Sequence, residues 1–156
     1  MTAEPNKPSS QVKLINFLDI EWHIADISSI GEEWAETKPD LSVGLAITHR
    51  VVPNKKLICI RCFVQFSQEE AVFNEDFLLK YITEAHFELT SFEEIISVDP
   101  NDNERYRIPT ELLHVLTGVT ISTTRGLLIS KTSSSYFNYF YLPILSPTDI
   151  TNLLTS

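Results

Sequence analysis

The sequence predicts an α+β fold: a four-stranded antiparallel sheet, a meander with a crossover loop after its first strand, with helices packed on one face. Strand-like alternation of apolar and polar residues dominates the chain before residue 90, and helical signals appear only after residue 108. At 156 residues, one domain can bury roughly 70% of its unfolded surface. We therefore assign residues 12–156 to a single domain and residues 1–11 to a disordered tail.

Four segments account for the sheet. Residues 12–24 are expected to form the first strand, and residues 41–50 alternate well enough to predict a half-buried second strand. Residues 57–66 alternate again after a turn at 53–56, and two strands joined by so short a turn form an antiparallel hairpin. Residues 77–89 carry the clearest strand pattern, with one apolar face and one charged face.

Helical signals begin at residue 109. Pro109 suits the first position of a helix, residues 110–117 continue it, and Gly118 is suited to end it. Residues 119–134 allow two interpretations. Their β-branched side chains favour a strand, whereas a hydroxyl at position 120 or 122 could cap a helix.

The remaining segments are connections and a short last helix. Residues 25–39 are expected to form a long connection that contains Trp34 among acidic residues. Residues 97–107 are polar and rich in turn residues, which predicts a loop. Ser146 and Pro147 open a final helix over residues 148–154.

The charge balance disfavours two classes of partner. The chain has 12 basic and 21 acidic residues and a net charge of −9. Nucleic-acid backbones require clustered Lys and Arg, and anionic membrane surfaces repel an acidic protein. No apolar run approaches the roughly 20 residues that span a bilayer. With two cysteines and no signal-peptide core, the expected location is a reducing cytoplasm in which both thiols are free.

No constellation of residues points to catalysis, a cofactor or a metal. Cys59 and Cys62 form a CxxC pair, but positions i and i+3 of a strand point to opposite faces, and no nearby histidine completes a metal site. The histidines lack metal-ligand spacing, and His86 is expected to be solvated on the polar face of its strand. Neither a phosphate-binding loop nor a nucleophile elbow is present. We therefore expect no enzymatic activity.

An aromatic run at residues 136–141 stands out instead. It either caps the core or forms a binding surface, since aromatic residues are enriched at interfaces and in peptide grooves. If the run is extended, alternation places Phe137, Tyr139 and Tyr141 on one side, opposite Tyr136 and Phe140. One side would then pack on the core while the other lines a groove or a subunit contact.

The order of these features resembles the SecB family of tetrameric chaperones, which hold precursor polypeptides unfolded for export. The similarity lies in the crossover Trp34 and Pro39, the alternating strand at 41–45, the strand at 77–87, and the positions of Arg125 and Pro143. The chain departs from the family at Ser122-Thr123-Thr124, at Gly126 and at Ile144-Leu145-Ser146. We also expect no long segment after Leu154 of the kind with which the export chaperone engages the SecA motor.

The resemblance implies a holdase chaperone that works without ATP or any cofactor, and a homotetramer built as a dimer of dimers. It implies a long helix over residues 120–133, after a break at Gly118, sandwiched between the dimers. The implied contact residues on this helix are Thr120, Thr124, Arg125 and Leu128.

The family's client groove implies Trp34 on one wall and a last helix on the other, with Trp34 at least partly exposed. The implied residues of that helix are Ile150, Leu153 and Leu154. From the sequence alone we add Phe137, Phe140 and Tyr141 to this groove. The expected partners are unfolded polypeptides, with the SecA motor or an antitoxin as further candidates that the resemblance suggests. The alternative is an adaptor of the same fold that binds one specific partner, such as an antitoxin.

Overall fold

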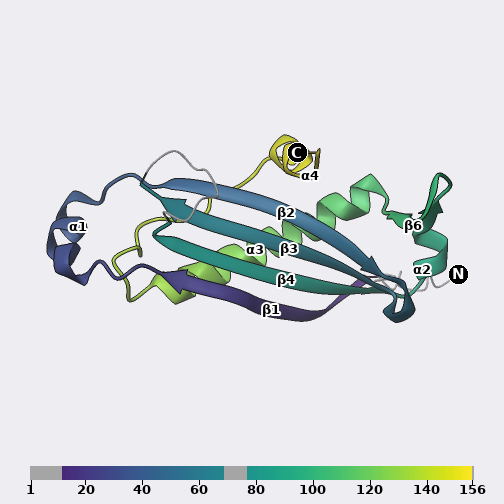
Figure 1. Ribbon diagram of the computed structural model, residues 1–156, viewed down its shortest axis with the longest axis horizontal. Helices are drawn as coiled ribbons and strands as arrows, with labels where there is room; N and C mark the ends of the chain where they lie inside the picture. The colour runs from purple at the N-terminus through teal and green to yellow at the C-terminus, as the bar shows by residue number, and fades with distance from the viewer. Residues whose placement is uncertain (1–11, 69–76, 156) are drawn as a thin grey trace, which may run out of the picture.

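The computed structural model describes residues 12–68 and 77–155, so the segment predicted to be a tail lies outside the described residues. A four-stranded antiparallel sheet in the order β1-β4-β3-β2 forms its centre (Figure 1). The strands are β1 (Val12–Ile24), β2 (Ser42–Val52), β3 (Leu57–Ser67) and β4 (Leu79–Leu89). The predicted α+β class and its antiparallel sheet are confirmed.

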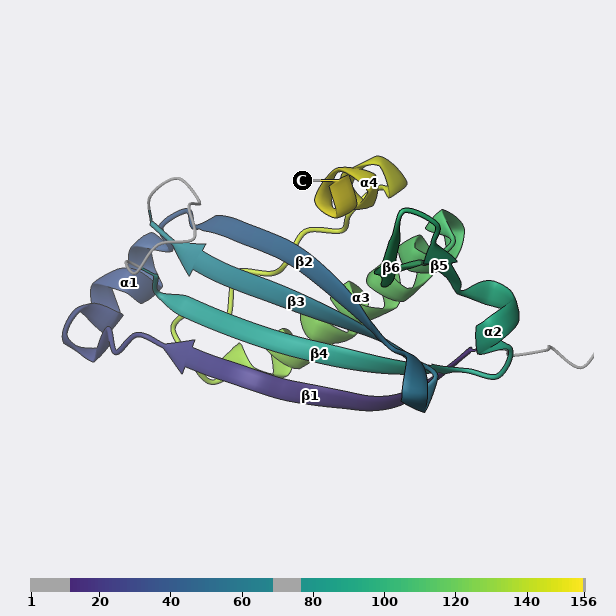
Figure 2. The ribbon, with the colours of Figure 1, turned by 45° about the vertical axis from the view of Figure 1, so that its right-hand side comes forward.

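Two helices are placed around this sheet. Helix α3 (Thr110–Thr132) runs across one face, and α4 (Pro147–Thr155) lies beyond the β2 edge (Figures 1 and 2). No described helix lies over the other side of the sheet, which we call the open face (Figures 1 and 2). The shorter elements are η1 (Ser28–Ile30), α1 (Gly31–Thr37), η2 (Pro53–Lys55), α2 (Phe92–Ile95), β5 (Ser97–Asp99) and β6 (Asp102–Arg107).

Two segments predicted to be irregular are structured. The connection at 25–39 contains η1 and α1, and the first turn of α1 carries Glu32 and Glu33, where carboxylates interact favourably with the helix dipole. Residues 97–107 form the β5–β6 hairpin, with an ion pair of 3.3 Å between Arg107 Nη2 and Asp99 Oδ1. The hairpin is mostly exposed and, within the part of the chain that the structure describes, packs on the core only through Tyr106, which pairs with Val98, so its sequence carries too few apolar positions to show an alternation.

Helix α3 is continuous through Gly118, so the predicted helix end at that residue is wrong. Three of its four buried threonine hydroxyls are satisfied within the helix: Thr120 Oγ1 donates to Leu116 O and Thr124 Oγ1 to Thr120 O, each at 2.8 Å, and Thr132 Oγ1 donates to Leu128 O at 2.9 Å. The fourth, Thr117 Oγ1, has no hydrogen-bond partner among the described residues. A hydroxyl bonded to the carbonyl one turn earlier can be buried at little polar cost. The β-branched run at 119–134 therefore forms a helix on the sheet, and the strand interpretation of that run is wrong.

Helix α3 is also long and apolar enough, by length and composition alone, to cross a membrane. The expectation that no stretch approaches spanning length does not hold for it. Of its 23 residues, seven are buried, and they face the sheet and its neighbouring segments. A helix packed on the sheet of its own domain can be equally long and apolar. Because the buried side of α3 covers the sheet, we treat α3 as the core helix.

The core consists of two apolar clusters between α3 and the sheet. The cluster nearer the crossover end centres on Trp34, Phe66, Tyr81, Ile121 and Phe137. The cluster nearer α2 centres on Ile58, Phe87, Phe92 and Leu116. Strand β3 has neighbours on both sides and is buried along most of its length.

The aromatic run at 136–141 forms turns rather than an extended strand. Phe140 N donates to Phe137 O at 3.2 Å, and this turn brings both rings toward the core. Phe137 packs edge-on against Trp34 with ring centroids 5.4 Å apart, and Phe140 packs against Phe66 at 4.7 Å. The predicted alternation, which put Phe137 and Phe140 on opposite sides, is therefore wrong. The exposed members are Tyr136 and Tyr141.

Candidate functional site

An apolar groove lies along the β2 edge of the sheet, beside α4. It has a volume of about 360 Å³. Strand β2 contributes one wall, and α4 with the segment that precedes it contributes the other. The lining residues are Val43, Leu45, Pro143, Leu145, Asp149, Asn152 and Leu153. We call this feature the β2 groove.

Strand alternation places the first wall. Val43 is paired with Phe66, and Leu45 with Val64, so all four side chains lie on the face that α3 covers. Because β2 is the edge of the sheet, Val43 and Leu45 are only partly buried there, whereas Phe66 and Val64 are fully covered. The edge position therefore leaves part of the core face open.

Arg125 of α3 holds the second wall in place. Its Nε donates to Leu142 O at 3.1 Å, and its Nη2 donates to Pro143 O at 2.6 Å. Charge-assisted bonds to two successive carbonyls fix the direction of the chain as it leaves the aromatic run. Leu142 is buried as a result, and Leu145 is presented to the groove.

A capping box fixes the start of α4. Ser146 Oγ accepts a hydrogen bond from Asp149 N at 3.2 Å, and Asp149 Oδ2 accepts one from Ser146 N at 2.7 Å. Asp149 Oδ2 also accepts from the Ser146 hydroxyl at 2.7 Å. This bond, together with the one from Ser146 N, holds the pKa of Asp149 below its usual range, so the carboxylate is ionised at the rim of the groove. The β2 groove thus combines apolar walls with a negative rim.

The geometry suits an extended chain better than a reaction. The outer edge of β2 pairs with no described strand, so its backbone groups lie beside the groove. Pro143, Leu145 and Leu153 offer apolar surface, and the polar lining residues are Asp149 and Asn152. Two further apolar side chains on the same segment are exposed, Tyr141 at 53% and Ile144 at 88%.

Two of the residues expected to bind a client are inaccessible. Trp34 is only 3% exposed and Phe137 is 1% exposed. The expectation that Trp34 is partly exposed is wrong, because α1 turns its indole inward onto the Phe137 ring. Both residues belong to the core beneath the crossover.

Of the other residues expected to bind a client, some lie at the β2 groove and others pack against the rest of the protein. Leu153 lines the β2 groove, and Tyr141 is exposed next to it in the chain. Ile150 points to α3, where its Cδ1 lies 3.9 Å from the position that a Cβ on Gly118 would occupy. Phe140 and Leu154 are partly buried, and the former packs on Phe66. The sequence did not indicate Val43, Leu45 or Leu145 as groove residues, and these are three of the five apolar residues of the lining.

Three residues expected at a subunit interface face the chain's own sheet instead. Thr120, Thr124 and Leu128 are buried, and Thr124 Oγ1 lies 2.8 Å from Thr83 Oγ1 of β4. That part of the prediction is wrong, since this face of α3 is covered within the monomer. The exposed side of α3 carries Val115, Val119, Ser122, Gly126 and Ile129.

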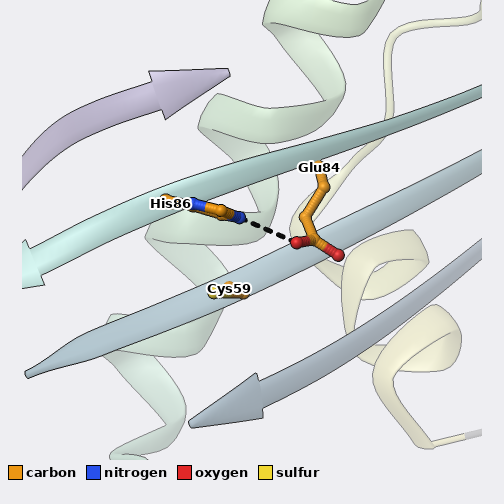
Figure 3. Close-up of side chains that lie close together, drawn as sticks. All are labelled: Cys59, Glu84 and His86. Carbon is orange, nitrogen blue, oxygen red and sulfur yellow. Dashed lines mark hydrogen bonds and ion pairs between the residues drawn. The ribbon is translucent and has the colours of Figure 1, made fainter. Parts of the chain in front are cut away.

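A second feature lies on the open face, where Glu84 forms the centre of an ion cluster with Arg50, Arg61 and His86. Figure 3 shows Glu84 bonded to His86, with Cys59 beside them. Glu84 Oε1 accepts hydrogen bonds from Arg50 Nη2 at 2.8 Å and from His86 Nε2 at 2.7 Å. Its Oε2 accepts from Arg61 Nε at 2.8 Å and lies 2.7 Å from Arg61 Nη2. Burial alone would raise the pKa of Glu84, but the bonds from His86, Arg50 and Arg61 lower it from 4.5 to about 2.

Cys59 lies beside this cluster, on the face opposite Cys62, as strand alternation predicts. The ligand atoms of Cys59, Glu84 and His86 all lie within 4.8 Å of one another, so the expectation that no histidine is near the CxxC pair is wrong, and His86 is not simply solvated. The sequence missed the cluster because its members meet only through strand register, with Arg61 opposite Glu84 and Cys59 opposite His86.

The charges of this cluster nevertheless disfavour a metal ion. Both oxygens of Glu84 already accept from cationic groups, and burial raises the pKa of the Cys59 thiol, which keeps it protonated. Coulomb's law puts the repulsion between a divalent ion and a guanidinium about 5 Å away at roughly 7 kcal/mol for an effective dielectric constant of about 20. With two guanidinium groups bound to Glu84, the donor set fits a cation poorly.

The comparisons with known proteins give distant likenesses in fold. No protein-family model matches the chain, and no curated protein matches it. Similar solved structures include the Mycobacterium tuberculosis SecB-like chaperone Rv1957 in complex with a peptide from the HigA1 antitoxin. That protein shares 11% identity, over 87% of this chain and 92% of its own, with a TM-score of 0.44. A protein of unknown function from Streptococcus agalactiae shares 12% identity, over 86% and 96%, with a TM-score of 0.36.

Replacing Glu84 tests the role of the ion cluster in stability. We expect Glu84→Gln to lower the free energy of unfolding by about 1–3 kcal/mol near neutral pH. This is less than the loss for a fully buried pair, because the two guanidinium groups can be solvated. A depressed carboxyl pKa contributes stability above its unfolded value of 4.5 and loses it as the pH falls through about 2.

The difference between the wild type and Glu84→Gln should therefore shrink between these pH values, as measured by chemical denaturation across a pH series. Glu88→Gln is the matched control, because Glu88 is exposed on the same strand. It should change stability by about 0.5 kcal/mol or less. Equal losses for the two variants, or a pH-independent difference, would contradict the assignment.

Proposed function

We propose that this protein is an ATP-independent holdase that binds extended, unfolded polypeptide segments in the β2 groove. The observation that supports this most strongly is an open apolar groove directly along a free sheet edge. Such an edge offers backbone hydrogen bonds to an added strand, and apolar walls accept alternate side chains of that strand. Backbone bonding and apolar contact both tolerate many sequences.

The charge of the protein favours a particular kind of segment. Asp149 stands at the rim of the groove, and the whole chain has a net charge of −9. Apolar segments flanked by basic residues gain electrostatic attraction, and segments with acidic flanks are repelled. Salt should weaken this preference, because exposed charges are screened.

We further propose that the protein assembles through the exposed side of α3 into a tetramer. The spacings between the exposed residues of α3 are four, three, four and three, as in the seam of packed helices. These residues are Val115, Val119, Ser122, Gly126 and Ile129. Ser122 and Gly126, in the middle of this set, permit close approach of a second helix. This exposed stripe takes the place of the buried hydroxyl face that the sequence suggested.

Helix packing can be tested at Gly126, because a Cβ there meets nothing within 4 Å in the monomer. Gly126→Leu should therefore fold, and the better helix former should even favour α3. Sedimentation should give a particle of about four times 17.8 kDa for the wild type and a smaller one for Gly126→Leu. Gly126→Ala, which stays small, should remain close to the wild type. A wild-type monomer, or a tetramer unaffected by the leucine, would refute this assembly.

Client binding can be tested with charges placed in the groove wall. We expect Leu145→Asp and Leu153→Asp to weaken binding to a permanently unfolded, fluorescently labelled protein by about tenfold or more. The estimate follows because burying one leucine contributes about 1.5–3 kcal/mol. Val98→Asp on β5 is the control, since it adds the same charge to an exposed apolar position away from the groove.

The proposal fails if all three variants bind equally well. Suppression of aggregation separates the holdase from an adaptor. A holdase should protect several unrelated unfolded proteins, and this protection should fall in Leu153→Asp. A protein that protects none of them, but binds one native partner through the same groove, would be an adaptor instead.

A further inference from the structure

The open face of the sheet contains a small pocket that the groove does not involve. It has a volume of about 170 Å³ and lies over β2, β3 and β4. Its lining residues are Thr48, His49, Arg50, Cys59, Arg61, Phe63 and Glu84. Strand register assembles it, because Thr48 pairs with Arg61 and Arg61 pairs with Glu84 across adjacent strands.

The pocket is positively charged in an acidic protein. Arg50 and Arg61 carry two positive charges, and Glu84 carries one negative charge, which leaves an excess of one positive charge. Burial lowers the pKa of His49, so at neutral pH its ring adds a polar group without charge. A local positive site on a chain of net charge −9 attracts small anions while the rest of the surface repels them.

Glu84 holds both guanidinium groups in position before any ligand arrives. The side chain of Glu84 is 4% exposed, whereas those of Arg50 and Arg61 are 55% and 38% exposed. The carboxylate therefore lies beneath the two arginines and leaves their outer sides open to the solvent. Arginine side chains fixed in this way lose little conformational freedom on binding a ligand, which lowers the cost of association.

Each arginine also keeps hydrogen-bond donors for a ligand. A guanidinium has five N–H groups. Among the described residues, Arg50 donates to Glu84 through Nη2, and Arg61 does so through Nε and Nη2. The Nη1 groups of both arginines take no part in these bonds. The Thr48 hydroxyl lines the same pocket and can donate as well.

We propose that this pocket is a binding site for a small oxyanion of the phosphate class. Arg50 and Arg61 bind the anion, and Glu84 is the positioning residue. A phosphate group presents several acceptor oxygens and can bond to both guanidinium groups at once, which is the geometry that arginine pairs favour. The site lies on the face opposite α3 and is independent of the proposed groove function.

Isothermal titration with inorganic phosphate in a phosphate-free buffer tests this directly, with chloride at equal ionic strength as the reference. We expect saturable binding of phosphate and none of chloride. Arg50→Ala should weaken phosphate binding by about tenfold or more, since each charge-assisted bond contributes roughly 1.5–3 kcal/mol. Arg50→Lys should also weaken it, because lysine keeps the charge but lacks the planar fork.

Arg105→Ala is the matched control, because Arg105 is a well-exposed arginine on β6, away from the pocket, and its loss should leave the affinity unchanged. The Arg61 Nε resonance should shift on titration, which a binding site elsewhere would not cause. Equal heats for phosphate and chloride, or equal losses for Arg50→Ala and Arg105→Ala, would overturn the proposal. Tighter binding of acetate than of phosphate would overturn the phosphate assignment. Stabilisation by Zn²⁺ that Cys59→Ser abolishes would replace the anion site by a metal site.

Discussion

The packing of the threonine face of α3 on the sheet is the constraint on which the rest of the structure depends. Three of the four buried threonine hydroxyls are tolerated there because each donates to a carbonyl one turn earlier in the helix, as Thr120, Thr124 and Thr132 do; only Thr117 lacks such a partner among the described residues. Thr124 also lies within hydrogen-bond distance of Thr83 on β4, so the helix is fixed in rotation as well as in position. A purely apolar face would allow the helix to pack on the sheet in more orientations about its own axis.

That rotation decides what the other sides of α3 do. With Thr124 against the sheet, Arg125 points to the segment after the aromatic run and bonds to Leu142 O and Pro143 O. This segment then places Leu145 and α4 opposite β2, and the β2 groove results. The same rotation exposes Gly126, where a second helix could approach closely. Groove and proposed assembly surface are thus two consequences of one packing arrangement.

Much of the fold was predictable because apolar and polar residues alternate along strands that are buried on one face. The hairpin of β2 and β3, the strand β4 and the last helix lie close to where the pattern placed them. Errors arose where local pattern and tertiary contact disagree. Gly118 favours a helix end locally, but here it lies inside α3, next to Ile150 of α4. Phe137 and Phe140 alternate in sequence, yet a turn brings both toward the core.

The candidate sites were less predictable than the fold, for a related reason. Trp34 stands among acidic residues, and the sequence alone cannot tell whether such a tryptophan is buried or is an exposed aromatic anchor. Its burial depends on Phe137, about a hundred residues later in the chain. Glu84, Arg50 and Arg61 come from three strands and meet only through register. The sequence pattern placed Leu153 on the last helix and the resemblance suggested that this helix forms a groove wall; Leu153 does line the β2 groove, while its part in client binding stays a prediction.

The central claim is that an unfolded polypeptide binds along the β2 edge, and hydrogen–deuterium exchange with and without a saturating unfolded client tests it most directly. The account predicts slower exchange for the outward-facing amides of β2 and for the first turns of α4, with no change in β4, whose amides are already paired on both sides. Protection confined to β1 or to the open face, with β2 and α4 unchanged, would contradict it.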